Sequence, residues 1–204
     1  MNYTTLQSTV VDYLHRSDIS TGSPTKCQDF IERARVRIGR ELRSLEQEVS
    51  GTVSSFTASV GALPTDFLEM IKVEVNGVGL RAVNHLEMQY WADNASPEVY
   101  AIYNRNLFCP GATSATILYY RQEAALSSGA TEHATMAAHP QLWIYAAVRE
   151  GAIWTHDLEL AQVMDQAFKD EVSQINAAAK MARYGIAPAT IDSGMNTYAG
   201  PPAL

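Results

Sequence analysis

Residues 25–45 read TKCQDFIERARVRIGRELRSL and carry the longest helical pattern in the sequence. Thr25 and Gln28 have the spacing of a capping box, in which each side chain bonds the other residue's backbone N–H at a helix start. The apolar residues that follow recur at intervals of three and four, which predicts an amphipathic helix of five turns. They are Cys27, Phe30, Ile31, Ala34, Ile38, Leu42 and Leu45. Because Cys27 lies on this stripe, we interpret it as a core residue and not as a nucleophile.

A second helix is predicted before this one. Its apolar stripe consists of Leu6, Val10, Tyr13 and Leu14, and Thr4 with Gln7 again has capping-box spacing. Residues 17–23 are rich in Ser, Thr, Asp and Gly, which typically end a helix. We therefore predict a pair of helices in residues 1–48.

The hydrophobic period changes to two from about residue 50. Ile71, Val73 and Val75 alternate with charged residues, and Asn76-Gly77 follows as a strong hairpin signal. A second hairpin is expected around Asn104-Arg105, whereas 61–66 is expected to break the sheet. We predict a β-rich insertion domain over 49–125, built as a small antiparallel sheet or barrel. Its expected strands are 49–58, 71–75, 80–83, 99–103, 106–109 and 115–120, with a short helix at 86–91.

The C-terminal half returns to helical spacing. Residues 126–139 are small and polar and are predicted to form a loop, after which Pro140 takes its preferred place at a helix start. One helix face then holds Leu142, Tyr145, Ala146, Arg149 and Ile153. Asp157 is the expected N-cap of a last helix, whose apolar stripe fades near Arg183. Residues 140–183 are therefore predicted to form a second helix pair.

The expected fold class is α+β. The helix pairs from both termini form a four-helix bundle, the small antiparallel β domain is inserted between them, and residues 184–204 form an extended tail. This tail holds three prolines, three glycines and few large apolar residues, so it cannot form a core of its own. We expect it to bind a partner or a neighbouring copy through Tyr184, Ile186, Pro188, Ile191, Met195, Tyr198, Pro201 and Leu204.

Composition excludes several classes of protein. The 204 residues are 47% hydrophobic and 18% charged, which argues against wholesale disorder, and no apolar run is long enough to span a bilayer. Residues 1–5 lack the pattern of a signal peptide. The net charge of −7 arises entirely after residue 50, and such an acidic body argues against general nucleic-acid binding.

Candidate catalytic and metal sites are weak. His133 and His139 lie in the predicted loop beside Glu132, but no third ligand has suitable spacing, so we interpret both as solvated histidines. No nucleophile elbow, zinc-protease helix, phosphate-binding loop or dinucleotide motif is present. We expect no enzyme activity, no metal and no cofactor.

Three arginines on the helix of residues 25–45 have two interpretations. Arg33, Arg37 and Arg40 lie opposite its apolar stripe. They either form a solvated face, with Asp29, Glu32 and Glu41 as local partners, or contact an acidic neighbour such as a second copy of this chain. We name them as candidate subunit-contact residues.

The order of several short motifs resembles a known family. Two N-terminal helices are followed by Leu63-Pro64-Thr65-Asp66-Phe67-Leu68 and then by Val73-Glu74-Val75-Asn76-Gly77. The hairpin Tyr100–Asn104 with Leu107–Pro110, the strand Ile117–Tyr120 and the helix opened by His139-Pro140 come next. Over residues 3–180 this series is similar to the head–tail adaptor (connector) proteins of tailed bacteriophages, which are related to the tail tubular proteins of short-tailed phages.

The resemblance implies a non-enzymatic virion protein, assembled in the host cytoplasm and located at the phage neck. Its copies would form a ring, usually of twelve, that binds the portal protein above and a tail or nozzle protein below. DNA would pass through the lumen without specific binding, and no membrane would be involved. The alternatives are a tail tubular or neck-completion protein that binds on the tail side, and a small enzyme whose site is not visible in the sequence.

Overall fold

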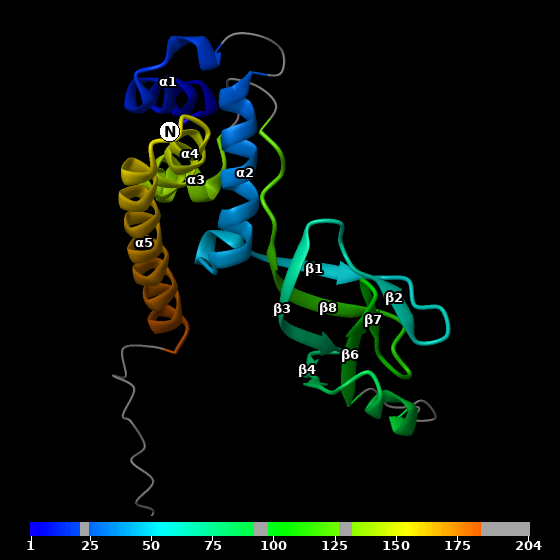
Figure 1. Ribbon diagram of the computed structural model, residues 1–204. Helices are drawn as coiled ribbons and strands as arrows, with labels where there is room; N and C mark the ends of the chain where they lie inside the picture. The colour runs from blue at the N-terminus through cyan, green and yellow to red at the C-terminus, as the bar shows by residue number, and fades with distance from the viewer. Residues whose placement is uncertain (21–24, 92–97, 127–131, 185–204) are drawn as a thin grey trace, which may run out of the picture.

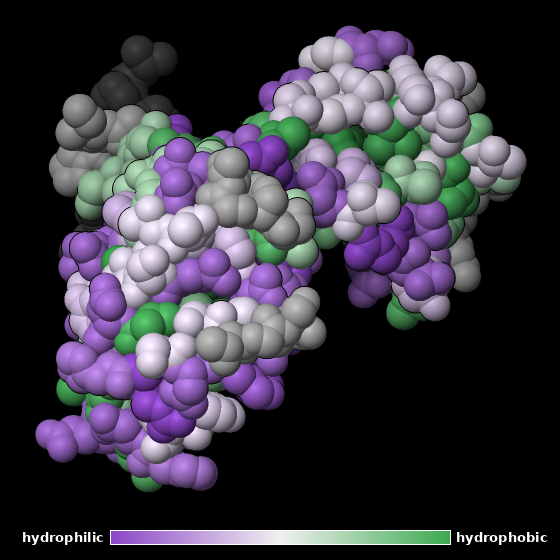
Figure 2. Space-filling model, turned by 90° about the horizontal axis from the view of Figure 1, so that it is seen from above, coloured by the Kyte–Doolittle hydropathy of each residue, from purple (hydrophilic) through white to green (hydrophobic). Residues whose placement is uncertain are grey.

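The computed structural model shows an α+β protein with a helical part and a separate β part (Figure 1). The structure describes residues 1–20, 25–91, 98–126 and 132–184. Seen from above, the two parts form two lobes, with hydrophilic and hydrophobic residues interspersed over the visible face (Figure 2). The α+β class agrees with the prediction from the sequence.

Within the described residues the helical part contains five α-helices: α1 Tyr3–Leu14, α2 Lys26–Glu41, α3 Ala134–Ala138, α4 Pro140–Trp154 and α5 Leu158–Tyr184. Four were expected. The additional helix, α3, lies inside the segment 126–139 that was predicted to be a loop. Its residues are small, but Met136 is completely buried in the helical core, so tertiary packing supports a helix that local sequence does not indicate.

The predicted start of α2 is confirmed. The Thr25 hydroxyl accepts from the Gln28 backbone N–H at 3.1 Å, and the Gln28 side chain accepts from the Thr25 N–H at 2.9 Å. The helix ends at Glu41, earlier than expected. Leu42 stays buried beyond its end, and Leu45 lies in the 3₁₀ turn η2, Leu45–Gln47.

The predicted cap of α1 is wrong. Asn2 caps this helix, because its side chain accepts from the Thr5 backbone N–H at 2.9 Å while its own backbone is extended. Thr4 lies inside the helix and therefore cannot be its N-cap residue. The apolar stripe is confirmed at Leu6, Val10 and Leu14, which are buried, but it is wrong at Tyr13, which is 44% exposed.

The helices share one apolar core. The central helix is α4, which packs against α1, α2, α3 and α5. The sequence predicted a single buried face for α4, yet buried residues surround it almost completely, and Ile153, placed on that face, is 41% exposed. The buried residues of α4 are Leu142, Trp143, Ile144, Ala146, Ala147, Val148, Gly151 and Ala152.

The β part contains eight short strands in the described residues: β1 Glu48–Val53, β2 Val60–Ala62, β3 Phe67–Val75, β4 Val78–Gly79, β5 Arg81–Ala82, β6 Val99–Tyr103, β7 Asn106–Phe108 and β8 Ala115–Arg121. They form two four-stranded sheets, ordered β1-β8-β3-β4 and β2-β7-β6-β5. Every pair is antiparallel except β5 with β6, which is parallel. The expected antiparallel domain is therefore present, with one departure.

Strand β2 lies where the sequence predicted a break. A Cβ atom at Gly61 would lie 2.4 Å from Cγ1 of Val53, so glycine permits a close approach of the two strands at this point.

The hairpin signals are confirmed: Asn76 and Gly77 have φ of 53° and 79°, and Asn104 and Arg105 have φ of 48° and 59°, as type I′ turns require. A 3₁₀ helix, η3 Glu87–Trp91, replaces the short helix expected at 86–91.

The end of α5 at Tyr184 agrees with the predicted fading near Arg183. Asp157 begins the helix as expected, with its side chain accepting from the Leu160 N–H at 3.0 Å. Of the proposed partner-binding residues, Tyr184 is the last residue of α5. The remaining seven lie outside the described residues.

Candidate functional site

The predicted arginines of α2 line one open cleft between α2, α4 and α5, of about 610 Å³. We call it the arginine cleft. Five basic and four acidic side chains surround it: Arg33, Arg37, Arg40, Arg149 and Lys169 with Glu32, Glu41, Glu150 and Asp165. The sequence placed the three arginines on one face, but it could not show that α4 and α5 complete the cleft.

Asp165 of α5 organises the charges of this cleft. Its Oδ1 lies 2.7 Å from Nη2 of Arg37 and 2.9 Å from Nε of Arg149, and its Oδ2 lies 2.7 Å from Nζ of Lys169. The hydrogen bond from Lys169, with that from Arg37, holds the pKa of Asp165 below its usual value against the opposing effect of burial. One carboxylate therefore joins three helices.

The three arginines have different environments. Arg37 is largely buried, with its side chain 15% exposed; its guanidinium carbon lies 4.1 Å from the centroid of the Phe168 ring, and its Nε lies 3.0 Å from Glu41. Arg33 and Arg40 are exposed, and neither side chain makes a hydrogen bond or ion pair with another described residue. Of the local ion pairs expected for these arginines, the one between Arg37 and Glu41 is present. Glu32 instead pairs with Arg35.

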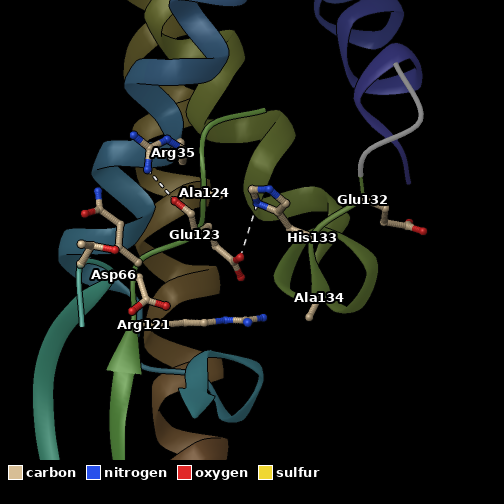
Figure 3. Close-up of a pocket in the computed structure, with 10 residues that line it drawn as sticks. Arg35, Asp66, Arg121, Glu123, Ala124, Glu132, His133 and Ala134 are labelled. Atoms are coloured by element: carbon tan, nitrogen blue, oxygen red, sulfur yellow. Dashed lines mark hydrogen bonds and ion pairs between the residues drawn. The ribbon is translucent and has the colours of Figure 1, made fainter. Parts of the chain in front are cut away.

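A second cavity, the junction pocket, lies where the helices meet the β part and measures about 560 Å³ (Figure 3). It is lined by Arg35 of α2, by Thr65 and Asp66 before β3, by Arg121–Ala124 at the end of β8, and by Glu132–Ala134 at the start of α3. Arg35 Nη1 donates to the backbone carbonyl of Glu123 at 2.6 Å and so ties α2 to the segment that follows β8.

His133 and Glu123 form a buried pair in this pocket, with side chains 7% and 6% exposed and a distance of 3.5 Å between Nδ1 and Oε2 (Figure 3). The rings of His133 and Trp143 also form a T-shaped contact, with their centroids 5.7 Å apart. The interpretation of His133 as a solvated loop residue is therefore wrong. His139 was misjudged in the same way: it is only partly exposed, and its Nε2 lies 3.4 Å from Glu46.

The pKa of His133 is lowered, chiefly because burial disfavours the imidazolium. Glu123 opposes this shift, while Arg35 and Arg121 reinforce it. A lowered pKa means that the unfolded chain binds the proton more readily than the folded one, so the stability that His133 contributes is present above its unfolded pKa and is lost as the pH falls.

We therefore expect the free energy of unfolding to decline between about pH 6.5 and pH 5, before most carboxylates titrate. The decline should be smaller in His133→Gln, which cannot be protonated in this range. Urea denaturation at half-unit pH steps measures both proteins. An equal decline in the parent and in His133→Gln would show that another group causes the pH dependence. His15→Gln replaces a histidine at an exposed position and is the matched control, which should decline as the parent does.

The two cysteines are not nucleophiles. Cys27 lies in the helical core and Cys109 in the core of the β part, and burial raises the pKa of each thiol to about 11. Both therefore remain protonated at neutral pH. In the described part of the chain, no group of three or more His, Cys, Asp and Glu side chains is placed to hold a metal ion, and no helix has the length and apolarity needed to cross a membrane.

Comparison with known protein families matches residues 1–199 to a family described as SU10 adaptor protein. No curated protein matches the sequence. The family match covers the helical part, the β part and most of the C-terminal segment. It agrees with the resemblance carried by the ordered motifs, and the chain therefore belongs to the SU10 adaptor family, a family of structural proteins of the bacteriophage head–tail connection.

Proposed function

We propose that this protein is a head-to-tail adaptor whose copies form a ring below the portal, extend the DNA channel and provide a platform for tail attachment. The family supports a structural role in the virion with portal and tail components as partners. In this proposal the helices from both ends of the chain form the bundle that makes ring-to-ring contacts. The β part projects outward or toward the next tail component. The role requires no catalysis.

The arginine cleft is the observation that supports ring formation. Arg33 and Arg40 present two exposed charges without a partner among the described residues, on either side of the internally paired Arg37. Residues 51–204 carry the whole excess of negative charge. Copies placed side by side can therefore bring acidic surface to these arginines, and complementary charges favour this orientation over others.

The acidic balance also suits a DNA channel. The net charge of −7 is repeated in every copy of a ring. A surface of like sign repels the phosphate backbone, and this favours passage of DNA over adhesion.

Native mass spectrometry of the protein mixed with its cognate portal at micromolar concentration tests this function. We expect a stoichiometric complex with the copy number of a closed ring, which is usually twelve in the family that the sequence resembles. Absence of any association with the portal under these conditions would overturn the proposed position in the virion.

Reversing the charge of both exposed arginines, Arg33→Glu with Arg40→Glu, is expected to lower the copy number on the portal. The thermal unfolding midpoint should change little, because exposed substitutions usually alter stability by no more than about 0.5 kcal/mol. Lys26→Glu with Lys180→Glu makes the same charge change at exposed helical positions outside the cleft. Full rings in both double variants would exclude the arginine cleft as the subunit contact.

A further inference from the structure

Three arginines connect the helical part to the β part. Arg35 of α2 donates to the carbonyl of Glu123 at 2.6 Å. Arg43, just beyond α2, donates from Nε to Glu69 Oε2 of β3 at 2.6 Å and from Nη1 to the carbonyl of Leu42 at 2.6 Å. Arg183 of α5 donates from Nε to Glu48 Oε1 of β1 at 2.8 Å. Arg35, Arg43 and Arg183 together form what we call the arginine latch.

Tyr120 of β8 lies between two members of this latch. Its ring centroid is 5.5 Å from the guanidinium carbon of Arg43 and 5.0 Å from that of Arg183, and its hydroxyl accepts a hydrogen bond from Arg183. The side chain is buried, with 4% of the residue exposed. A guanidinium that stacks on an aromatic ring and also pairs with a carboxylate is held in a defined orientation.

Apolar packing does not supply a second connection. The buried apolar residues form one cluster in the helical part and others in the β part, and among the residues that the structure describes no cluster includes both. Tyr120 belongs to none of them. Because cores resist deformation whereas a small polar interface permits rotation, the latch sets the orientation of the β part.

The position of Arg183 makes this orientation sensitive to the end of α5. Arg183 is the penultimate residue of the helix, directly before residues 185–204. Moving or unwinding the last helical turn removes its guanidinium from Glu48 and Tyr120 together. Arg35 lies on α2, and the backbone N–H of Arg43 is held by Asn176, which lies earlier in α5, so both remain in place.

We propose that the last turn of α5 sets the orientation of the β part: Arg183 holds the β part in one orientation, and displacement of this turn releases the β part to rotate. The latch itself requires only the isolated chain.

Distance measurement between two spin labels tests the latch in the isolated protein. Gln162→Cys in α5 and Thr116→Cys in β8 provide exposed sites on the two parts, and the buried native cysteines are protected from labelling. We expect one narrow distance distribution in the parent chain. Arg183→Ala should widen it roughly twofold or more, because a hinge that loses its fixing contact samples several orientations.

Two further variants keep the test decisive. Glu48→Gln removes the charge that Arg183 pairs with and should also widen the distribution, even if Arg183→Ala folds poorly. Lys180→Ala removes a positive charge from the same end of α5 at an exposed position and should leave the distribution unchanged. An unchanged width in both Arg183→Ala and Glu48→Gln overturns the latch. Failure to bind portal overturns the proposed function but does not affect this measurement.

Discussion

Replacing Trp143 by alanine is expected to lower the free energy of unfolding by about 3–5 kcal/mol, the usual cost of removing a large buried aromatic side chain. Trp143 is completely buried in α4, the helix that packs against four others. The substitution also removes the ring that forms the T-shaped contact with His133. The cavity therefore opens at the centre of the helical core and beside the junction pocket.

Urea denaturation followed by circular dichroism measures this loss, and a lower midpoint with an unchanged slope is the expected result. Tyr90→Ala is the control, because Tyr90 is an aromatic residue exposed in η3 and its removal should change stability by no more than about 0.5 kcal/mol. Equal effects of the two substitutions would contradict the central position of α4 in the core.

The elements best predicted from the sequence are those whose residues satisfy one another locally. The Thr25–Gln28 capping box and the Asn76-Gly77 turn each need only neighbouring residues, and both are present. Strand β2 and helix α3 depend on distant contacts, such as the close approach of Gly61 to Val53 and the burial of Met136. Local propensity is weak evidence for such segments, because tertiary packing decides their conformation.

The same distinction applies to the candidate sites. The face of α2 that carries Arg33, Arg37 and Arg40 follows from helical spacing alone. Their different roles do not, since Arg37 is paired by Asp165, which lies on another helix far along the chain. His133 was misplaced for the same reason: its pairing with Glu123 requires the end of β8 to meet the start of α3, and no sequence spacing indicates that meeting.

Ending the chain at Tyr184 is expected to abolish portal binding while leaving the fold intact. The helical core is formed by residues between Tyr3 and Ile175, so the shortened chain retains it. The removed segment carries apolar side chains suited to a partner surface: Ile186, Pro188, Ile191, Met195, Tyr198, Pro201 and Leu204. If three of these are buried in the complex at about 1.5 kcal/mol each, their loss weakens binding by roughly a thousandfold.

A full-length variant separates the side chains from the length of the segment. Ile186→Ser, Ile191→Ser and Met195→Ser together should reproduce the loss seen with the shortened chain, whereas Thr190→Ala, Ser193→Ala and Asn196→Ala together should bind as the parent does. Native mass spectrometry with portal measures all three chains, and thermal unfolding confirms that each is folded. Portal binding that survives both the truncation and the serine substitutions would move the contact elsewhere on the molecule. Residues 185–204 would then be available to bind a tail component, and the same three chains mixed with the tail protein would test that contact.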